Sequence, residues 1–309
     1  MRKPPPPSGR PRAWWNEFQQ KGEQRWLTEA IASGKLDPQP FIAKLRVNHP
    51  EAVPAAVLAG AAQAAGEWLR RDYLAALGSI RTAAAADFLL AEIRDAKSAG
   101  TRVAAASQLF IRDHPAALPA IIAEWRRSAL LESEFGDGTS ERLIRLLVAS
   151  GDATAITALG ENWREVPVRT RHEVVLTLGQ DPDRKHVAAS WEIANKPMSA
   201  AAREAAIALL VRALEAAIAL VVRALEDTDA YKGLSGYNGD YSYSDPRVCD
   251  TALWALHRTD PASYARSAKA GRVQQDRERI AAANVWRQAH HQELLPLPVA
   301  TPPKPAWER

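Results

Sequence analysis

The chain has 309 residues, 47% of them hydrophobic, 25% charged and 7% aromatic, and 60 are Ala, which is typical of a helix-rich globular protein. Sparse aromatic residues and short β-branched runs disfavour an all-β sandwich or a parallel-sheet enzyme. The net charge of +4 arises from four basic residues within positions 1–12, so the rest of the chain is neutral and bulk charge indicates no face for duplex nucleic acid.

Cysteine content and hydropathy indicate the compartment. The single cysteine, Cys249, excludes an intrachain disulfide and a thiolate zinc cluster. The N-terminus is basic and proline-rich where a secretory signal needs an apolar core. The longest apolar stretch, residues 205–225, is interrupted by Arg212, Glu215 and Arg223. We therefore expect a cytoplasmic protein without a membrane-spanning segment.

The two ends of the chain are rich in proline. Ten of the 21 prolines lie in residues 4–11 and 296–305. This composition predicts a disordered, basic tail over residues 1–12 and a second Pro-rich tail over residues 293–309. No linker interrupts residues 13–292, which we expect to form a single domain, with residues 13–49 as an irregular cap.

Between the tails, apolar segments at helical spacing alternate with turn signals. The signals are Asp37-Pro38, His49-Pro50, His114-Pro115, Gly136-Asp137-Gly138, Ser150-Gly151-Asp152, Asp181-Pro182, Lys196-Pro197, Asp245-Pro246 and Asp260-Pro261. Self-comparison aligns the segments that begin at Thr101, Thr170 and Ala202. Their second residues, Arg102, Arg171 and Arg203, are 69 and 32 residues apart. A fourth segment begins at Asp245-Pro246-Arg247-Val248, and the whole pattern fits a period of about 35 residues.

This pattern resembles the second helix of HEAT repeats, in which an Asp or Pro opens the helix and a Val-Arg-like pair follows. The resemblance covers roughly residues 50–290 and identifies the chain as similar to HEAT-repeat (armadillo-like) α-solenoids, in a bacterial style. It implies an all-α fold: a right-handed α-solenoid of HEAT-like helical pairs. Each pair has too little core to fold alone and must stack on the next.

The dipeptide His172-Glu173 is similar to the His-Glu motifs of deoxyhypusine hydroxylase, a HEAT-repeat enzyme that holds two irons with four such pairs. The other histidines supply no second adjacent His-Glu pair, and a di-iron site needs several converging ligands. A Gly-rich phosphate loop, a GxSxG elbow and a zinc-ligand spacing are also absent. We therefore predict no catalytic residue, no metal site and no cofactor.

DNA alkylation-repair glycosylases also use HEAT-like solenoids, and this resemblance supplies an alternative. Trp125-Arg126-Arg127 and Trp163-Arg164 would be its concave-face contacts with nucleic acid. Against it, tryptophans recur about once per repeat, which core packing also predicts. They are Trp68, Trp125, Trp163, Trp191, Trp254 and Trp286.

Residues 205–215 and 216–226 are a tandem duplication, AAIALLVRALE followed by AAIALVVRALE. Eleven residues rotate a helix by three turns plus about 20°, so the apolar face stays in phase. The second copy lengthens the helix by about 16 Å. We predict one helix over residues 199–226, whose extra length is either a contact surface or the harmless product of a replication slip or of an engineered insertion.

Residues 227–250 contain four of the six tyrosines, and Asn238-Gly239 between them is the strongest hairpin signal in the chain. We expect a short Tyr/Gly-rich loop or β-hairpin insertion near residues 231–244. Tyrosines flanked by Ser, Gly and Asn are typical of adaptable binding surfaces, although they could instead pack the loop onto the solenoid. The candidate partner-binding residues are Tyr231, Tyr237, Asn238, Tyr241, Tyr243, Asp245 and Arg247.

The sequence therefore favours a non-catalytic scaffold or adaptor that binds another protein through its concave face and the Tyr-rich loop. The alternative is a solenoid that acts on nucleic acid. Membrane binding is not expected.

Overall fold

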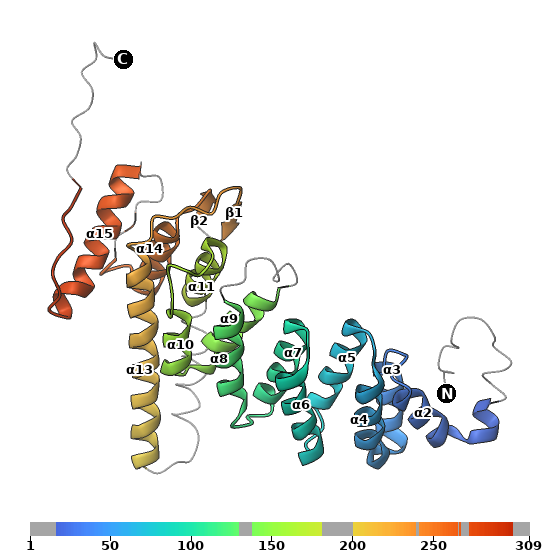
Figure 1. The fold of residues 1–309 in the computed structure, drawn as a ribbon. Coiled ribbons are helices and arrows are strands. Elements are labelled where there is room, and N and C mark those ends of the chain that lie inside the picture. Colours follow the sequence, from blue (N-terminus) through green and yellow to red (C-terminus); the bar gives the residue numbers. More distant parts are fainter. Residues whose placement is uncertain are drawn as a thin grey trace. The chain divides into compact units, whose positions relative to one another are not determined.

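The computed structural model describes residues 17–129, 138–180, 200–238, 241–264, 266 and 272–298. The predicted tail over residues 1–12 and residues 299–309 of the second tail lie outside these ranges. The chain forms two compact units, unit 1 (Met1–Glu124) and unit 2 (Trp125–Arg309). The regular structure of the described residues is helical except for one hairpin (Figure 1), so the all-α prediction is confirmed at the level of secondary structure.

Unit 1 is built from consecutive short helices. Two of them, α2 and α3, are regular helices within the segment that the sequence predicts as an irregular cap. The elements are α2 (Glu23–Ala32), α3 (Gln39–Asn48), η1 (Pro50–Ala52), α4 (Val53–Gln63), α5 (Glu67–Gly78), α6 (Ala83–Asp95), α7 (Ala99–Ile111) and α8 (Ala117–Ser128), within which the unit boundary falls.

Unit 2 contains the remaining elements and the hairpin. These are α9 (Thr139–Ser150), α10 (Ala153–Leu159), α11 (Val168–Gln180), α13 (Ala200–Ala224), β1 (Ser235–Asn238), β2 (Tyr241–Ser244), α14 (Val248–Thr259) and α15 (Arg272–Ala289). The predicted single helix over residues 199–226 is confirmed by α13, which runs for 25 residues. None of the described helices is long and apolar enough to cross a membrane.

Local capping explains where the helices begin and end. The Thr82 hydroxyl accepts a hydrogen bond from the Ala85 amide at the start of α6, and Ser98 does the same for Thr101 at the start of α7. At the turn Ser150-Gly151-Asp152, Gly151 adopts the left-handed conformation that ends α9, and Asp152 caps α10. Predicted turn signals thus become helix ends.

The core of unit 1 depends on one glycine. Tyr73 of α5 is buried, and its hydroxyl donates a 2.6 Å hydrogen bond to the Ile31 carbonyl at the end of α2. A Cβ placed on Gly60 of α4 would lie 2.2 Å from that carbonyl oxygen and 2.3 Å from the Tyr73 ring. Only glycine therefore lets α4 lie against both α2 and Tyr73.

A structural repeat links α5–α6 to α7–α8. Arg70 is the fourth residue of α5 and Arg102 the fourth residue of α7. Arg70 binds Glu92 through Nε and Nη2 at 3.0 and 2.5 Å. Arg102 binds Glu124 in the same way at 2.8 and 2.7 Å. Each pair spans 22 residues, and the two pairs are 32 residues apart.

The same guanidinium groups also bind carbonyls that precede their helices. Arg102 donates to the carbonyls of Ala96 and Lys97 at 2.9 Å, and Arg70 donates to Ala61. Two further aligned arginines, Arg171 in α11 and Arg203 in α13, are again fourth residues of their helices. This position therefore recurs in four helices of the chain.

The tryptophans do not all behave as predicted. Trp125, Trp163 and Trp254 are buried in unit 2, as core packing requires. Trp68 is 77% exposed on α5, so the prediction that it packs in the core is wrong. Its side chain is on the first turn of the helix, where Glu67 and Arg71 form a surface ion pair. Trp286 is partly buried and stacks on His290, whereas Trp191 lies outside the described residues.

Candidate protein-binding surface

The predicted hairpin follows α13 and precedes α14 (Figure 1). Strands β1 and β2 pair antiparallel, with Ser235 opposite Ser244, Gly236 opposite Tyr243, Tyr237 opposite Ser242 and Asn238 opposite Tyr241. The side chains of residues 236–238 and 241–243 lie outside the described part of the structure. We call residues 227–234 and 245–250, which flank the two strands, the base of the hairpin.

The base is organised around a carboxylate, Asp227, that is completely buried. Its Oδ2 accepts a 2.9 Å hydrogen bond from the indole Nε1 of Trp163 and a second bond from Nη1 of Arg171. Its Oδ1 accepts a 3.3 Å bond from Arg164. A buried charge is tolerated only with this degree of pairing, so the first residue after the α13 turn is fixed in place.

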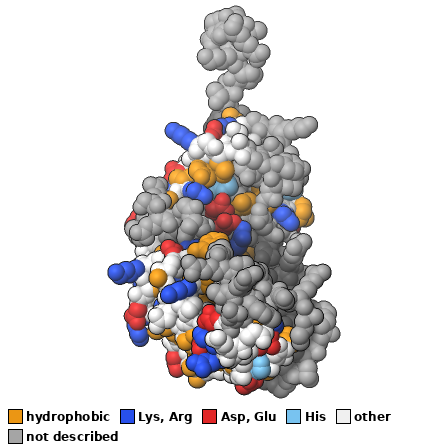
Figure 2. Space-filling view, turned by 90° about the vertical axis from the view of Figure 1, so that its right-hand side faces the viewer, with side chains coloured by type: hydrophobic (Ala, Val, Ile, Leu, Met, Phe, Trp, Pro, Cys, Tyr) orange, Lys and Arg blue, Asp and Glu red, His pale blue; other side chains and the backbone are white. Residues whose placement is uncertain are grey.

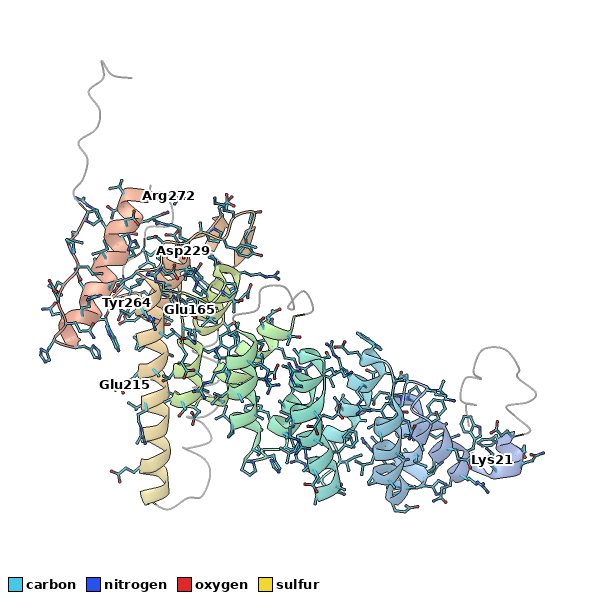
Figure 3. The ribbon with its side chains drawn as sticks, viewed as in Figure 1. Lys21, Glu165, Glu215, Asp229, Tyr264 and Arg272 are labelled. Atoms are coloured by element: carbon cyan, nitrogen blue, oxygen red, sulfur yellow. The ribbon has the colours of Figure 1, made fainter. Side chains whose placement is uncertain are left out.

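Arg171 connects this carboxylate to α11. It is buried, and its Nη2 binds Asp229 at 2.7 Å while its Nε donates to the Val166 carbonyl at 2.9 Å. One guanidinium thus holds both aspartates of the segment Asp227-x-Asp229, near the labelled Asp229 in Figure 3. Planar, bidentate geometry of this kind favours arginine over lysine.

Backbone hydrogen bonds close the base on its other side. The amide of Val248 donates to the Asp229 carbonyl at 3.0 Å, and the amide of Cys249 donates to the Asp227 carbonyl at 2.8 Å. Ala230 and Arg247 form an isolated antiparallel bridge. The chain entering the hairpin is therefore paired with the chain that leaves it.

Asp245 shapes the stem of the hairpin. Its φ of 46° lies in the left-handed region, which aspartate tolerates better than most residues. Its carboxylate accepts a 2.6 Å hydrogen bond from the Gly233 amide, and its own amide donates to the Leu234 carbonyl at 2.7 Å. Asp245 is exposed, but these bonds give it a role in holding the stem.

Arg247 directly precedes α14 and is buried. It binds Asp250 through Nε and Nη2 at 3.0 and 2.7 Å, and Asp276 of α15 through Nη1 at 2.9 Å. The hydrogen bonds that Arg247 donates to the Asp250 carboxylate raise the pKa of Arg247. The sequence proposes Arg247 as a partner contact, whereas the structure commits its guanidinium to joining α14 with α15.

Tyr231 lies at the start of the segment and is partly exposed. Its ring meets the buried ring of His172 edge to face, with centroids 6.3 Å apart. Burial lowers the pKa of His172 to about 4, so the imidazole is neutral at pH 7. Within the described ranges, no group of three or more His, Cys, Asp or Glu side chains is placed to hold a metal ion.

Of the residues predicted to contact nucleic acid, Trp125, Arg126 and Arg164 bind other residues of unit 2. Trp125 donates from Nε1 to the Ala158 carbonyl at 2.9 Å. Arg126 forms an exposed ion pair with Glu161 at 2.7 Å, and Arg164 is bound to Asp227. On the face seen in Figure 2, basic and acidic side chains are interspersed rather than gathered by sign.

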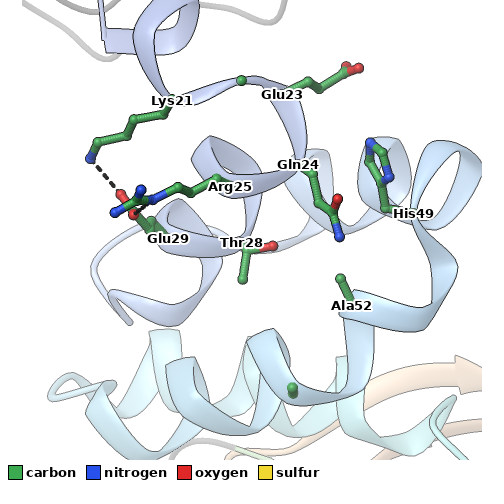
Figure 4. A pocket seen from close by; sticks show the side chains of 10 residues that line it. Lys21, Glu23, Gln24, Arg25, Thr28, Glu29, His49 and Ala52 are labelled. Atoms are coloured by element: carbon green, nitrogen blue, oxygen red, sulfur yellow. Dashed lines mark hydrogen bonds and ion pairs between the residues drawn. The ribbon is translucent and has the colours of Figure 1, made fainter.

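Two hollows lie on the surface of the described residues. One of about 780 Å³ lies at the start of α2 (Figure 4), where Lys21 binds Glu17 and Glu29, and Arg25 also binds Glu29. The other, of about 410 Å³, lies between the end of α10 and residues 216–223 of α13. The charged groups named in the first are paired with one another, which makes it a weak receptor for a charged ligand.

Sequence reasoning placed the hairpin but missed what holds it. The sequence marks Arg171 only as one of the repeated arginines, and no local pattern joins it to Asp227 or Asp229. The signal that could have joined them is the excess of Arg at the fourth helical position, which requires an acidic partner when buried.

No family model, no curated protein and no solved structure matches the chain.

Proposed function

We propose that this protein is a non-catalytic scaffold or adaptor, a right-handed HEAT-like α-solenoid that holds another protein through its concave face and its Tyr-rich hairpin. The observation that carries the proposal is the base of the hairpin. A buried carboxylate with three side-chain donors and a paired backbone present a short, tyrosine-rich ribbon from a fixed point.

The repeated arginine supports the solenoid. Arg70, Arg102 and Arg171 share the fourth helical position, bind carbonyls that precede their helices, and pair with an acid on a later segment. Recurrence of one interaction in several helices along the chain is typical of stacked repeats, because each repeat meets its neighbour in the same way.

The hairpin suits protein binding for two physical reasons. A ribbon fixed at its base loses little conformational freedom when a partner binds. Tyrosine offers a large, amphipathic contact area with only two side-chain torsions to restrict. Residues two apart on a strand share a face, so positions 241 and 243 are the pair proposed to meet the partner together.

Charge narrows the kind of partner. Three of the five aspartates in residues 227–250 are paired with arginines: Asp227 and Asp229 with Arg171, and Asp250 with Arg247. Asp245 is exposed at the stem and has no ion pair with a residue that the structure describes, so it favours a partner surface of positive charge at that point. The buried, lone Cys249, whose thiol pKa burial raises to about 12, is inert and compatible with the reducing cytoplasm in which we place the protein.

The test compares the full chain with the variant Y237S/Y241S/Y243S as bait for proteins from the source cells, analysed by mass spectrometry. We expect a partner that the intact chain captures and the triple variant loses. The matched control is Trp68→Ser, which removes an exposed aromatic from unit 1 and should leave capture unchanged. Circular dichroism must show equal helical content in all three proteins.

Two outcomes would contradict the proposal. If the triple variant captures the same proteins, the hairpin is not the anchor. If nucleic acid copurifies and no protein does, the glycosylase-like alternative replaces the scaffold.

A further inference from the structure

The arginines of unit 1 fall into two groups. Eight arginines lie among its described residues, and five of them form an ion pair with an acid of the same unit: Arg25, Arg70, Arg71, Arg94 and Arg102. The other three are Arg46, Arg81 and Arg112, and none of them has an ion pair with a residue that the structure describes. They lie at the carboxyl ends of α3, α5 and α7, or in the turns that follow these ends.

Hydrogen bonds connect these three helix ends along one edge of unit 1. Arg46 donates from Nη2 to the Ser79 hydroxyl at 2.9 Å, and Ser79 directly follows α5. Arg81 donates from Nη1 to the Arg112 carbonyl at 3.0 Å, and Arg112 donates from Nη2 to the Thr82 carbonyl at 3.0 Å. The turn after α5 is therefore bound both to α3 and to the turn after α7.

The acceptors along this edge are one hydroxyl and two carbonyls, so they leave the positive charge uncompensated. Arg112 is partly buried, and its Nη1 has no acceptor among the described residues. Burial and the adjacent charge of Arg81 both lower the pKa of Arg112. Asp113 follows Arg112 and is exposed, but the two form no ion pair. An added anion would offset the repulsion between Arg81 and Arg112.

Two exposed aliphatic side chains are next to these arginines in the sequence. Val47 directly follows Arg46 and is 80% exposed, and Ile111 directly precedes Arg112 and is 61% exposed. They are two of the three most exposed large hydrophobic side chains among the described residues. We call Arg46, Val47, Arg81, Ile111 and Arg112 the turn edge. Arginine together with apolar side chains is typical of surfaces that bind proteins.

The chemistry of the turn edge selects the class of partner. A planar guanidinium group binds a carboxylate or a phosphate through two parallel hydrogen bonds, so the three arginines favour an anion. Val47 and Ile111 require apolar side chains to cover them, which an acidic protein segment supplies and a sugar-phosphate backbone does not. The helical body as a whole is neutral, so the attraction acts only at short range around the edge.

We propose that the turn edge binds an acidic segment of a partner protein. The carboxylates of this segment pair with Arg46, Arg81 and Arg112, and its apolar side chains cover Val47 and Ile111. The turn edge belongs to unit 1 and the Tyr-rich hairpin to unit 2. This contact therefore does not rest on the hairpin, and the two proposals can fail separately.

A fluorescence anisotropy titration of the full chain tests the class of ligand. The probe is a labelled synthetic peptide made of three Glu-Leu-Asp-Ser repeats. We expect binding that weakens as the salt concentration rises, because the ion pairs lie at the surface. A peptide of Gln-Leu-Asn-Ser repeats lacks the charge, and one of Glu-Ser-Asp-Ser repeats lacks the apolar side chains, so each should bind at least about tenfold more weakly.

A charge variant of the full chain locates the contact. R46Q/R81Q removes two exposed charges and leaves the partly buried Arg112 unchanged. It should weaken binding of the Glu-Leu-Asp-Ser peptide about tenfold. The matched control is R25Q/R94Q, which removes two exposed charges of the same unit from arginines that already have acidic partners. This control has the same net charge as the test variant and should bind the peptide as the natural chain does.

An apolar variant tests the other half of the turn edge. V47S/I111S keeps every charge and changes only the two exposed aliphatic side chains. It should also weaken binding of the Glu-Leu-Asp-Ser peptide about tenfold. Circular dichroism must show equal helical content in all the variants. The charge variant and the apolar variant change different residues, so a loss of helix in one leaves the other as the test.

The proposal fails if the natural chain does not bind the Glu-Leu-Asp-Ser peptide at the highest concentration tested. It also fails if the Glu-Ser-Asp-Ser peptide binds equally well, or if V47S/I111S binds as tightly as the natural chain. Unchanged binding by R46Q/R81Q would assign the attraction to the basic residues within positions 1–12 instead. Binding of a labelled DNA duplex that R46Q/R81Q abolishes would assign the turn edge to nucleic acid and likewise contradict the proposal.

Discussion

At the scale of single residues, buried arginines join different segments of the chain. Arg102, Arg171 and Arg247 are all buried, and each meets at least one carboxylate. Such pairs contribute little net stability compared with apolar packing, but removal of one member leaves an uncompensated charge in the interior. These ion pairs position the segments that they join, because the planar guanidinium fixes the direction from which the acidic side chain approaches.

Asp227→Asn tests this role. The neutral amide leaves buried Arg171 with only the partly exposed Asp229 as its acidic partner, and we expect the free energy of unfolding to fall by about 3 kcal/mol. Asp229→Asn is the matched control: Asp229 is 52% exposed, so its loss should cost at most about 1 kcal/mol. Urea denaturation followed by circular dichroism measures both, and equal effects would show that Asp227 is not the anchor.

At the scale of helices and strands, much of the fold follows from local signals. The turn pairs Asp37-Pro38, His49-Pro50 and His114-Pro115 lie between helices, and the in-phase duplication forms one helix. These features are predictable because capping, proline geometry and helical phase are properties of neighbouring residues. The hairpin also lies where Asn238-Gly239 predicts a turn between tyrosines.

Other features depend on contacts between residues that are distant in the sequence, and no local sequence pattern predicts these contacts. Arg70 belongs to the repeated arginines, but its neighbours Trp68 and Leu69 do not resemble those of Arg102, so self-comparison missed it. Arg171 and Asp227 are 56 residues apart. Trp68 fits the spacing of the buried tryptophans, yet its position on the helix turns it outward.

Gly60→Ala tests how closely α4 must pack. The new methyl group would overlap the Ile31 carbonyl and the Tyr73 ring, and we expect a loss of about 1–3 kcal/mol from overpacking. Gly66→Ala is the control, because a Cβ there meets nothing within 4 Å, and should cost less than about 1 kcal/mol. Thermal unfolding of both variants measures the difference in stability. Equal midpoint temperatures of unfolding would mean that α4 can shift without a loss of stability.

At the scale of the whole molecule, charge is unevenly distributed along the chain. The four basic residues of the first 12 positions account for the entire net charge of +4. Attraction to a polyanion therefore belongs to one end of the chain and not to its helical body.

Removal of residues 1–12 tests this separation. We expect weak, salt-sensitive binding of the full chain to labelled duplex DNA, with a slope of log K against log salt no steeper than about −3.6 for four phosphate contacts. The truncated chain should show no binding in the same fluorescence anisotropy titration. Retained binding would mean that the helical body itself reads nucleic acid, as the glycosylase-like alternative requires.

The ion pairs also carry a consequence for the order of folding. The pairs Arg70 with Glu92 and Arg102 with Glu124 each close a loop of 22 residues, whereas Arg171 with Asp227 closes one of 56. Closing the longer loop costs about 0.8 kcal/mol more chain entropy, and contacts between distant residues form slowly. We expect unit 1 to become structured first, both in refolding and during synthesis, with the hairpin set in place last. A chain interrupted before Asp227 would then lack the carboxylate that Arg171 requires, so the proposed binding ribbon forms only on molecules whose synthesis has passed that point.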